Sequence, residues 1–179
     1  MGDRPIQDSM QLGSAQARTV IRVAGRATLQ QSPALRAAAE IALERGPLVI
    51  DVRECEYLDS TMLGCLVGIR KLAEQQNCRL HLAADRGQQV KLFSTSALNR
   101  YFDFIPAADA VEGEWLEIEP ENLDAEALGR HVLACHERLA DRGGSEGDAF
   151  RQVCDRLSLE IEQREVDRAL RAANGKGTA

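Results

Sequence analysis

The period of the hydrophobic positions changes in a regular order over the first two thirds of the chain. Three segments have the apolar runs or alternation of strands: 17–24, 48–52 and 79–83. Three others carry apolar residues at helical spacing: 32–46, 60–76 and 87–95. Strands that alternate with helices need crossover connections, so we expect an α/β fold in which helices cover a mainly parallel or mixed β-sheet.

Ser32 and Ser60 stand where two of these helices begin. Serine is favoured as an N-cap because its hydroxyl accepts a hydrogen bond from the N–H groups of the first turn, so we expect both serines to cap their helices. Pro33 suits the first helical position after such a cap. Gly64 and Gly68 lie one turn apart, which allows the second of these helices to approach the sheet closely.

The last third of the chain has a different pattern. It begins with an acidic segment that lacks a clear period apart from a candidate strand at 115–118. Apolar residues then recur at helical spacing on both sides of Gly143-Gly144, which predicts a helical hairpin. The predicted organisation has five parts: a flexible N-terminus or at most an edge strand (1–15), the α/β domain (16–110), an acidic linker (111–122), the helical hairpin (123–172) and a disordered tail (173–179).

Charge and composition narrow the function classes. Residues 1–110 carry 13 Lys/Arg and 12 Asp/Glu, a net charge of +1, whereas residues 111–179 carry 9 and 16, a net charge of −7. The acidic second part argues against a nucleic-acid partner, because binding phosphates needs a basic surface. No apolar run reaches the roughly 18 residues of a membrane span, and no signal segment opens the chain, so we expect a cytoplasmic protein without membrane insertion.

A sequence motif follows the central predicted strand. Tyr57-Leu58-Asp59-Ser60-Thr61 leads into Leu63-Gly64 at the start of the helix. Together with Ile50 and Asp51, these residues resemble the "LDSSGLG" type segment of STAS domains, in particular those of anti-sigma-factor antagonists. The resemblance extends from about residue 17 to residue 106 and leaves out the C-terminal third. It implies an α/β STAS domain followed by an α-helical hairpin.

The resemblance also implies a function. In STAS proteins that act as partner switches, the serine or threonine directly after this aspartate is phosphorylated, which corresponds to Ser60, with Thr61 as the minor alternative. Such an anti-sigma factor antagonist binds, when unphosphorylated, an anti-sigma factor that is a GHKL-type serine kinase. A PPM-type serine phosphatase resets the switch. The expected partner-binding residues are Thr28, Tyr57, Asp59, Ser60, Thr61 and Met62.

Two departures from the family pattern keep alternatives open. Met62 stands where the family usually has glycine. The turn Gly25-Arg26-Ala27-Thr28 stands where the family often has an acidic residue just after the first strand. One alternative is a STAS scaffold or complex subunit that dimerises or binds partners through its helical hairpin. Another is a small-ligand sensor. Without a switch, Ser60 is only a helix cap, and the hairpin can be a stabilising appendage.

Metal binding, thiol chemistry and catalysis have weaker support in the sequence. Four residues of the predicted hairpin are of types that bind zinc: His131, Cys135, His136 and Cys154. Without a Cys-x-x-Cys pair, however, packing along a helix seam is the better explanation. The five cysteines suit reduced thiols, and no basic neighbour marks Cys55 or Cys65 as reactive. No hydrolase elbow, P-loop or dinucleotide fingerprint occurs, so we expect no enzyme, metal or cofactor.

Overall fold

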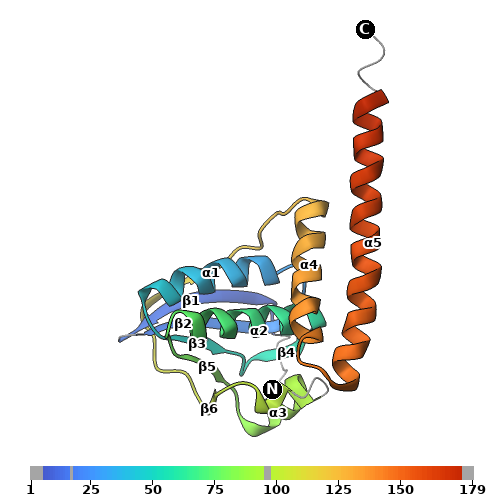
Figure 1. Cartoon of the computed structure of the whole chain (residues 1–179). Helices are drawn as coiled ribbons and strands as arrows, with labels where there is room; N and C mark the ends of the chain where they lie inside the picture. Colours follow the sequence, from blue (N-terminus) through green and yellow to red (C-terminus); the bar gives the residue numbers. More distant parts are fainter. Residues whose placement is uncertain (1–5, 17, 95–97, 175–179) are drawn as a thin grey trace. The chain divides into compact units, whose positions relative to one another are not determined.

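The computed structural model describes residues 6–16, 18–94 and 98–174. The chain divides into two compact units, Met1–Asn122 and Leu123–Ala179. Figure 1 follows the chain through both units. The first unit contains the β-sheet and the helices that cover it, and the second contains two helices.

The first unit is built on a mixed sheet. Its strands are β1 (Ser9–Ala15), β2 (Arg18–Ala27), β3 (Leu48–Asp51), β4 (Cys55–Leu58), β5 (Leu80–Ala83), β6 (Phe104–Ile105) and β7 (Glu112–Glu117). Its helices are α1 (Ser32–Arg45), α2 (Ser60–Gln75), α3 (Arg86–Phe93) and the 3-10 helix η2 (Leu98–Arg100). The strand order is β6-β5-β3-β2-β1-β7, and β4 pairs with β2. The strands pair in parallel, except that β1 is antiparallel to β2 and β7. The predicted α/β fold is confirmed.

The central strands are buried on both faces of the sheet. Ile21, Ile50 and Leu82 lie side by side in register on β2, β3 and β5, and all three are fully buried. On the other face, a second cluster contains Ala15, Val20, Val49 and Ala83, packed against Ile105, Ala108, Val111 and Trp115. Burial on both faces explains why β2 and β3 appear in the sequence as continuous apolar runs.

Helix α2 is enclosed over most of its length. Every residue from Thr61 to Ile69 is buried, and such a helix needs no polar face. Figure 1 shows α1 and α2 side by side over the sheet. The thiol of Cys65 on α2 donates to the backbone oxygen of Ser32 on α1, 3.3 Å away. The sheet and α1 therefore hold the start of α2 in one position.

Two segments that the sequence predicts as irregular or marginal are strands of the sheet. Residues 9–15, expected to be flexible or at most an edge strand, form β1, which lies between β2 and β7. Residues 112–117, in the expected acidic linker with its candidate strand at 115–118, form β7, which overlaps that candidate. Tertiary contacts hold these two segments in the sheet. One of them joins the guanidinium of Arg22 on β2 to the ring of Trp115 on β7, whose centre is 4.1 Å away. The exposed glutamates of β7 discourage further strand pairing at this edge.

The first helix begins differently from the prediction. The N-cap of α1 is Gln31, and Ser32 is the first helical residue, so the predicted Ser32 cap is wrong. The backbone oxygen of Thr28 accepts from the N–H groups of both Gln31 and Ser32, at 3.0 and 3.1 Å. The Ser32 hydroxyl instead donates to the backbone oxygen of Leu29, 3.1 Å away. A hydrogen-bonded backbone turn thus starts this helix.

The second unit consists of α4 (Ala125–Ala140) and α5 (Gly144–Asn174). Gly143 and Gly144 join them with φ angles of 75° and 72°, which glycine adopts most easily. The 31 residues of α5 span about 46 Å at the helical rise per residue. Glu126 forms ion pairs with Arg130 and Arg168, and Arg130 also pairs with Glu165 across the two helices at 3.4 Å. The predicted disordered tail begins too early, because residues 173–174 belong to α5, and its residues 175–179 lie outside the described residues.

Gly25 allows β2 to continue past the point where the sequence predicts its end. Its φ angle of 68° is in the left-handed region, and the pairing with β4 shifts register between Gly25 and Arg26. A Cβ atom here would lie 2.9 Å from the Cα of Asp8. The Asp8 carboxylate accepts a hydrogen bond from the backbone N–H of Arg26 at 2.8 Å. There is therefore no room for a side chain at this position.

We predict that Gly25→Ala lowers the free energy of unfolding of the first unit by about 2–4 kcal/mol. The left-handed conformation accounts for about 1–2 kcal/mol, and the displacement of Asp8 for the rest. Gly113→Ala is the matched control, because Gly113 also has a positive φ angle, 90°, but has open space around it. Urea unfolding followed by the fluorescence of Trp115 measures both variants. Equal destabilisation would show that crowding against Asp8 contributes nothing.

Candidate functional site

The start of α2 is held by the carboxylate of Asp59. Its Oδ1 accepts from the backbone N–H of Met62 at 2.8 Å, and its Oδ2 accepts from that of Leu29, also at 2.8 Å. One side chain therefore caps α2 and ties it to the turn between β2 and α1. The predicted Ser60 cap is wrong: Asp59 has the extended backbone of an N-cap, with φ −82° and ψ 173°, and Ser60 is already helical.

The turn between β2 and α1 lies beside this cap. The backbone N–H and the hydroxyl of Thr28 both donate to Oε1 of Gln31, at 3.0 and 2.9 Å. The backbone N–H of Asp59 donates to the oxygen of Ala27 at 3.2 Å. These bonds join the ends of β2 and β4 to the start of α2, and they bring Thr28 and Asp59 to the same end of the sheet.

The six predicted partner-binding residues differ in exposure. Tyr57 is 41% exposed, and Thr28, Asp59 and Ser60 are half-buried. Thr61 and Met62 are buried, so these two cannot contact a partner in this conformation, and the hydroxyl of Thr61 is not accessible for modification. Thr61 and Met62 are buried because they belong to the stretch of α2, from Thr61 to Ile69, that packs in the core. Because Met62 is in the interior, its side chain adds no bulk at the surface near Ser60.

Arg26 is an exposed residue that lies in the turn where the sequence departs from the family pattern. It lies opposite Tyr57 in the pairing of β2 with β4, and its guanidinium is 4.3 Å from the centre of the tyrosine ring. This is a cation–π contact, and both side chains are exposed. No local signal could have predicted the pair, because Arg26 and Tyr57 come together only when β4 pairs with the end of β2.

The loop between β3 and β4 is held by hydrogen bonds from α3. The side-chain amide of Gln88 donates to the backbone oxygens of Val52, Arg53 and Cys55, at 3.2, 2.8 and 2.8 Å. Arg53 forms two side-chain hydrogen bonds with the buried Asp51, at 2.9 and 2.8 Å. These hydrogen bonds raise the pKa of the Arg53 guanidinium above its ordinary value. These hydrogen bonds therefore fix the loop that leads into β4, the strand that carries Tyr57.

Cys55, at the start of β4, is buried beneath this surface. Its thiol donates to the backbone oxygen of Tyr57 at 3.4 Å. Burial raises the pKa of the Cys55 thiol to about 11. Because the thiolate is the reactive form of cysteine, Cys55 lacks the chemistry of a redox sensor at neutral pH.

The residues of the hairpin considered as zinc ligands make local contacts. Nε2 of His131 lies 3.6 Å from the sulfur of Cys135, and Nδ1 of His136 lies 2.8 Å from the backbone oxygen of Val132. Within residues 6–16, 18–94 and 98–174, no group of three or more His, Cys, Asp or Glu side chains is placed to hold a metal ion. In the same part of the chain, no helix is both long and apolar enough to cross a bilayer.

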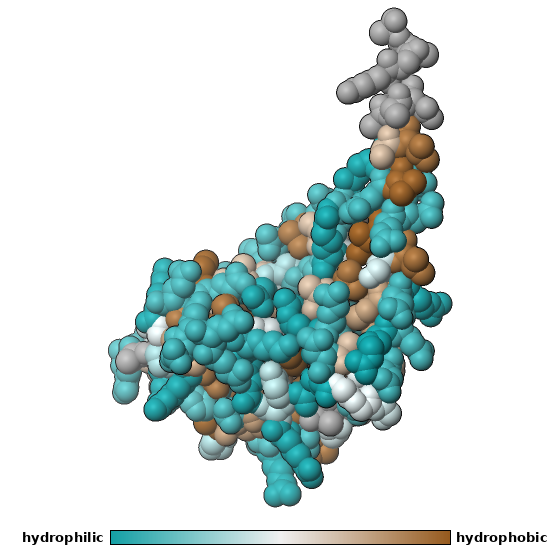
Figure 2. Space-filling view, in the orientation of Figure 1, coloured by the Kyte–Doolittle hydropathy of each residue, from teal (hydrophilic) through white to brown (hydrophobic). Residues whose placement is uncertain are grey.

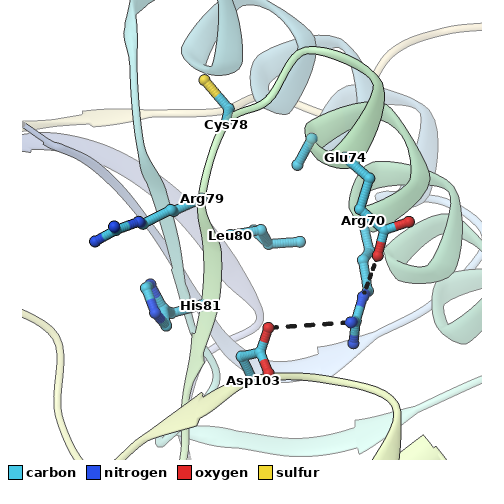
Figure 3. A pocket seen from close by; sticks show the side chains of 8 residues that line it. Arg70, Glu74, Cys78, Arg79, Leu80, His81 and Asp103 are labelled. Carbon is cyan, nitrogen blue, oxygen red and sulfur yellow. Dashed lines mark hydrogen bonds and ion pairs between the residues drawn. The ribbon is translucent and has the colours of Figure 1, made fainter.

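A pocket of about 340 Å³ lies between the C-terminal half of α2 and β5, apart from the predicted site. Figure 3 shows Arg70 on one side of it, joined to Glu74 and Asp103, and Arg79 and His81 on the other side of β5. The two ion pairs of Arg70 measure 2.8 and 4.0 Å, and its guanidinium also stacks on Tyr101 at 4.4 Å. The two carboxylates, Glu74 and Asp103, balance the two guanidinium groups of Arg70 and Arg79 that line the pocket, so it has no net charge to select an anion.

Comparisons with known proteins identify the family. The family model described as "Mlab, STAS domain" matches residues 10–106, which is 97 of the 179 residues. The chain therefore belongs to the STAS domain family. No curated protein sequence matches it significantly.

Solved structures to which this chain is similar include two anti-sigma factor antagonists. The antagonist SpoIIAA in its unphosphorylated form is 16% identical with a TM-score of 0.46, and the match covers 56% of this chain and 90% of that chain. An antagonist from Mycobacterium paratuberculosis is 20% identical with a TM-score of 0.46, covering 57% and 86%. A structure of Mglu is 9% identical with a TM-score of 0.39, covering 42% and 19%.

We predict that Asp59→Ala lowers the free energy of unfolding by about 2–4 kcal/mol. The variant loses a helix cap and also leaves the N–H of Leu29 without its charged acceptor. Asp85→Ala is the matched control, because Asp85 caps α3 through a single bond to the N–H of Gln88, and we expect it to cost only about 1 kcal/mol. Urea unfolding compares the two variants. A cost for Asp59→Ala no larger than that for Asp85→Ala would contradict the bridging role.

We also predict that Cys55 resists alkylation in the folded protein. With a pKa of about 11, only about one thousandth of this thiol is ionised at pH 8. Iodoacetamide labelling at pH 8, followed by peptide mapping, should leave Cys55 unmodified, whereas the same treatment in concentrated urea should label all five cysteines. Rapid labelling of Cys55 in the folded protein would refute its burial.

Proposed function

We propose that this chain is a STAS protein of the anti-sigma factor antagonist type. Its unphosphorylated form binds an anti-sigma factor that is a GHKL-type serine kinase, and phosphorylation of Ser60 releases that partner. A PPM-type serine phosphatase restores binding, and the chain itself has no catalytic role. The observation that carries the proposal is the position of Ser60, the half-buried first residue of α2, separated only by Asp59 from the strand that presents Tyr57.

The physical basis of the switch is a change of charge at one residue. A phosphate adds about −1.5 to −2 charge beside the carboxylate of Asp59. The start of α2 tolerates this charge, because the helix dipole places about half a positive charge there. A docked partner would have to bury the phosphate, at a cost of several kcal/mol. Phosphorylation therefore opposes binding while leaving the fold intact.

The surface around Ser60 suits a protein partner. Tyr57 and Arg26 are stacked and exposed, and tyrosine and arginine are the residue types that contribute most at protein interfaces. Because Arg26 stands where the family often has an acidic residue, the matching part of the partner should carry acidic side chains rather than basic ones. We include Arg26 in the binding surface together with Thr28, Tyr57, Asp59 and Ser60.

A second candidate function keeps the fold without the switch. In it, the chain is a STAS scaffold or complex subunit, and Ser60 remains unmodified. The observation that favours it is the turn containing Arg26 and Thr28, because the missing acidic residue there removes a feature through which a kinase could recognise this end of the sheet. Transfer of phosphate to Ser60 separates the two candidates.

We predict that wild-type protein and Ser60→Ala capture a GHKL-type kinase from the source cell, whereas Ser60→Asp loses it. The introduced carboxylate imitates part of the phosphate charge and should weaken binding at least about tenfold, as expected for an unpaired buried charge. Ser94→Asp is the control, because Ser94 is an exposed serine at the end of α3 and should keep the partner.

Incubation with the captured kinase and ATP tests the modification itself. Intact-mass measurement should show one added phosphate on the wild type and none on Ser60→Ala. If all variants capture the same partners and no phosphate is added, Ser60 is not a switch and the scaffold function replaces the proposed one.

A further inference from the structure

The outer face of α5 carries a row of exposed apolar residues. Leu159, Val166 and Leu170 are 65%, 53% and 57% exposed. Steps of seven and four residues keep them on one side of the helix, along about 17 Å of its axis. Figure 2 shows brown, hydrophobic residues along α5. We call these three residues the outer stripe. Exposed apolar residues that are grouped in this way are typical of an interaction surface.

The outer stripe lies opposite the face of α5 that packs on α4. On that inner face, a Cβ atom added to Gly129 of α4 would lie 3.7 Å from Cγ1 of Ile161, and Arg168 forms an ion pair with Glu126. At about 100° per residue, Ile161 and Arg168 point about 160–200° away from Leu159. The hairpin therefore uses one face of α5 for its own packing and leaves the outer stripe uncovered within the second unit.

Acidic side chains line both sides of the outer stripe. Asp155 and Glu162 follow one side, Glu160 and Asp167 follow the other, and all four are exposed. None of the four forms an ion pair with the part of the chain that the structure describes. Arg156 and Arg171 lie at the two ends of the stripe, so these flanking residues have a net charge of −2, from four carboxylates and two guanidiniums.

This charge pattern decides what can cover the outer stripe. A second copy of α5 would bring acidic flanks against acidic flanks in either the parallel or the antiparallel orientation, which is unfavourable between paired helices. An anionic membrane surface would be repelled for the same reason. A helix with an apolar stripe flanked by Lys or Arg matches both the shape and the charge.

We propose that the outer stripe of α5 binds a basic amphipathic helix of a partner protein. The apolar side chains of the partner pack on Leu159, Val166 and Leu170, and its basic flanks pair with the four carboxylates. The site belongs to the second unit and does not involve Ser60, so it stands or fails independently of the phosphorylation switch. It gives the helical hairpin a binding role in addition to that of the STAS domain.

The test uses the full chain and two synthetic helical peptides of about three heptads, identical in their Leu residues at a and d. One peptide has Lys at e and g, and the other has Glu there. We expect fluorescence anisotropy to show binding of the Lys peptide only. The double variant Leu159→Ser/Leu170→Ser should weaken that binding at least about tenfold, as for buried anchors of an interface. Ile41→Ser, at an exposed apolar residue of α1, should leave it unchanged.

Charge reversal separates the proposed site from non-specific adhesion. The variant Glu162→Lys/Asp167→Lys should bind the Lys peptide less tightly and the Glu peptide more tightly than the wild type. Circular dichroism should show unchanged helix content, because all the substituted residues are exposed.

Three results would overturn the proposal. The first is equal binding of the two peptides, or no binding of the Lys peptide, by the wild type. The second is a dimer in sedimentation experiments that is lost in Leu159→Ser/Leu170→Ser, since a second copy would then occupy the stripe. The third is binding to anionic lipid vesicles that depends on the same two leucines.

Discussion

The arrangement of the candidate binding surface depends on the carboxylate of Asp59. It accepts hydrogen bonds from the start of α2 and from the turn after β2, each at 2.8 Å. These two segments are about thirty residues apart in sequence and approach each other only at this end of the sheet. Ser60, Thr28 and the neighbouring strand ends are positioned by this link, so the surface is built on a hydrogen-bonded corner of the fold.

Consecutive residues at the start of α2 differ in burial. Ser60 remains at the surface, whereas Thr61 and Met62 turn into the interior as α2 enters the core. Of the hydroxyl groups of Ser60 and Thr61, only that of Ser60 is accessible to the phosphorylation that we propose, and the side chain of Met62 packs in the interior. Tyr57 and Arg26 complete the surface from the adjoining strands. The proposed phosphate would change the electrostatics of this surface without breaking the hydrogen bonds of Asp59 that hold it.

The two units present surfaces of different chemistry. The first offers a stacked arginine and tyrosine beside Ser60, and the second offers an apolar stripe bordered by carboxylates. Different partners are suited to each, because an acidic surface complements the first and a basic helix complements the second. The two proposed binding sites are therefore independent of each other, one in the STAS domain and one in the hairpin.

Sequence by itself determined the parts of the molecule whose signals are local. Strands β2 and β3 are buried on both faces and therefore appear as apolar runs, and the period of three to four residues identifies the helices. The Asp59-Ser60 motif indicated the family, and Gly143-Gly144 marked the turn of the hairpin. Phosphorylation of Ser60 remains a prediction, because it depends on a kinase and not on the fold.

Tertiary structure alone decided the features that depend on distant partners. Residues 9–15 and 112–117 had only weak strand signals, and they become strands of one sheet because 9–15 pairs with both β2 and β7 and Arg22 contacts Trp115. Arg26 meets Tyr57 only through the pairing of β4 with β2. Asp59 and Ser60 are both favoured cap residues, and the backbone at the end of β4 selects Asp59. In each case the local sequence allows several outcomes, and long-range packing selects one of them.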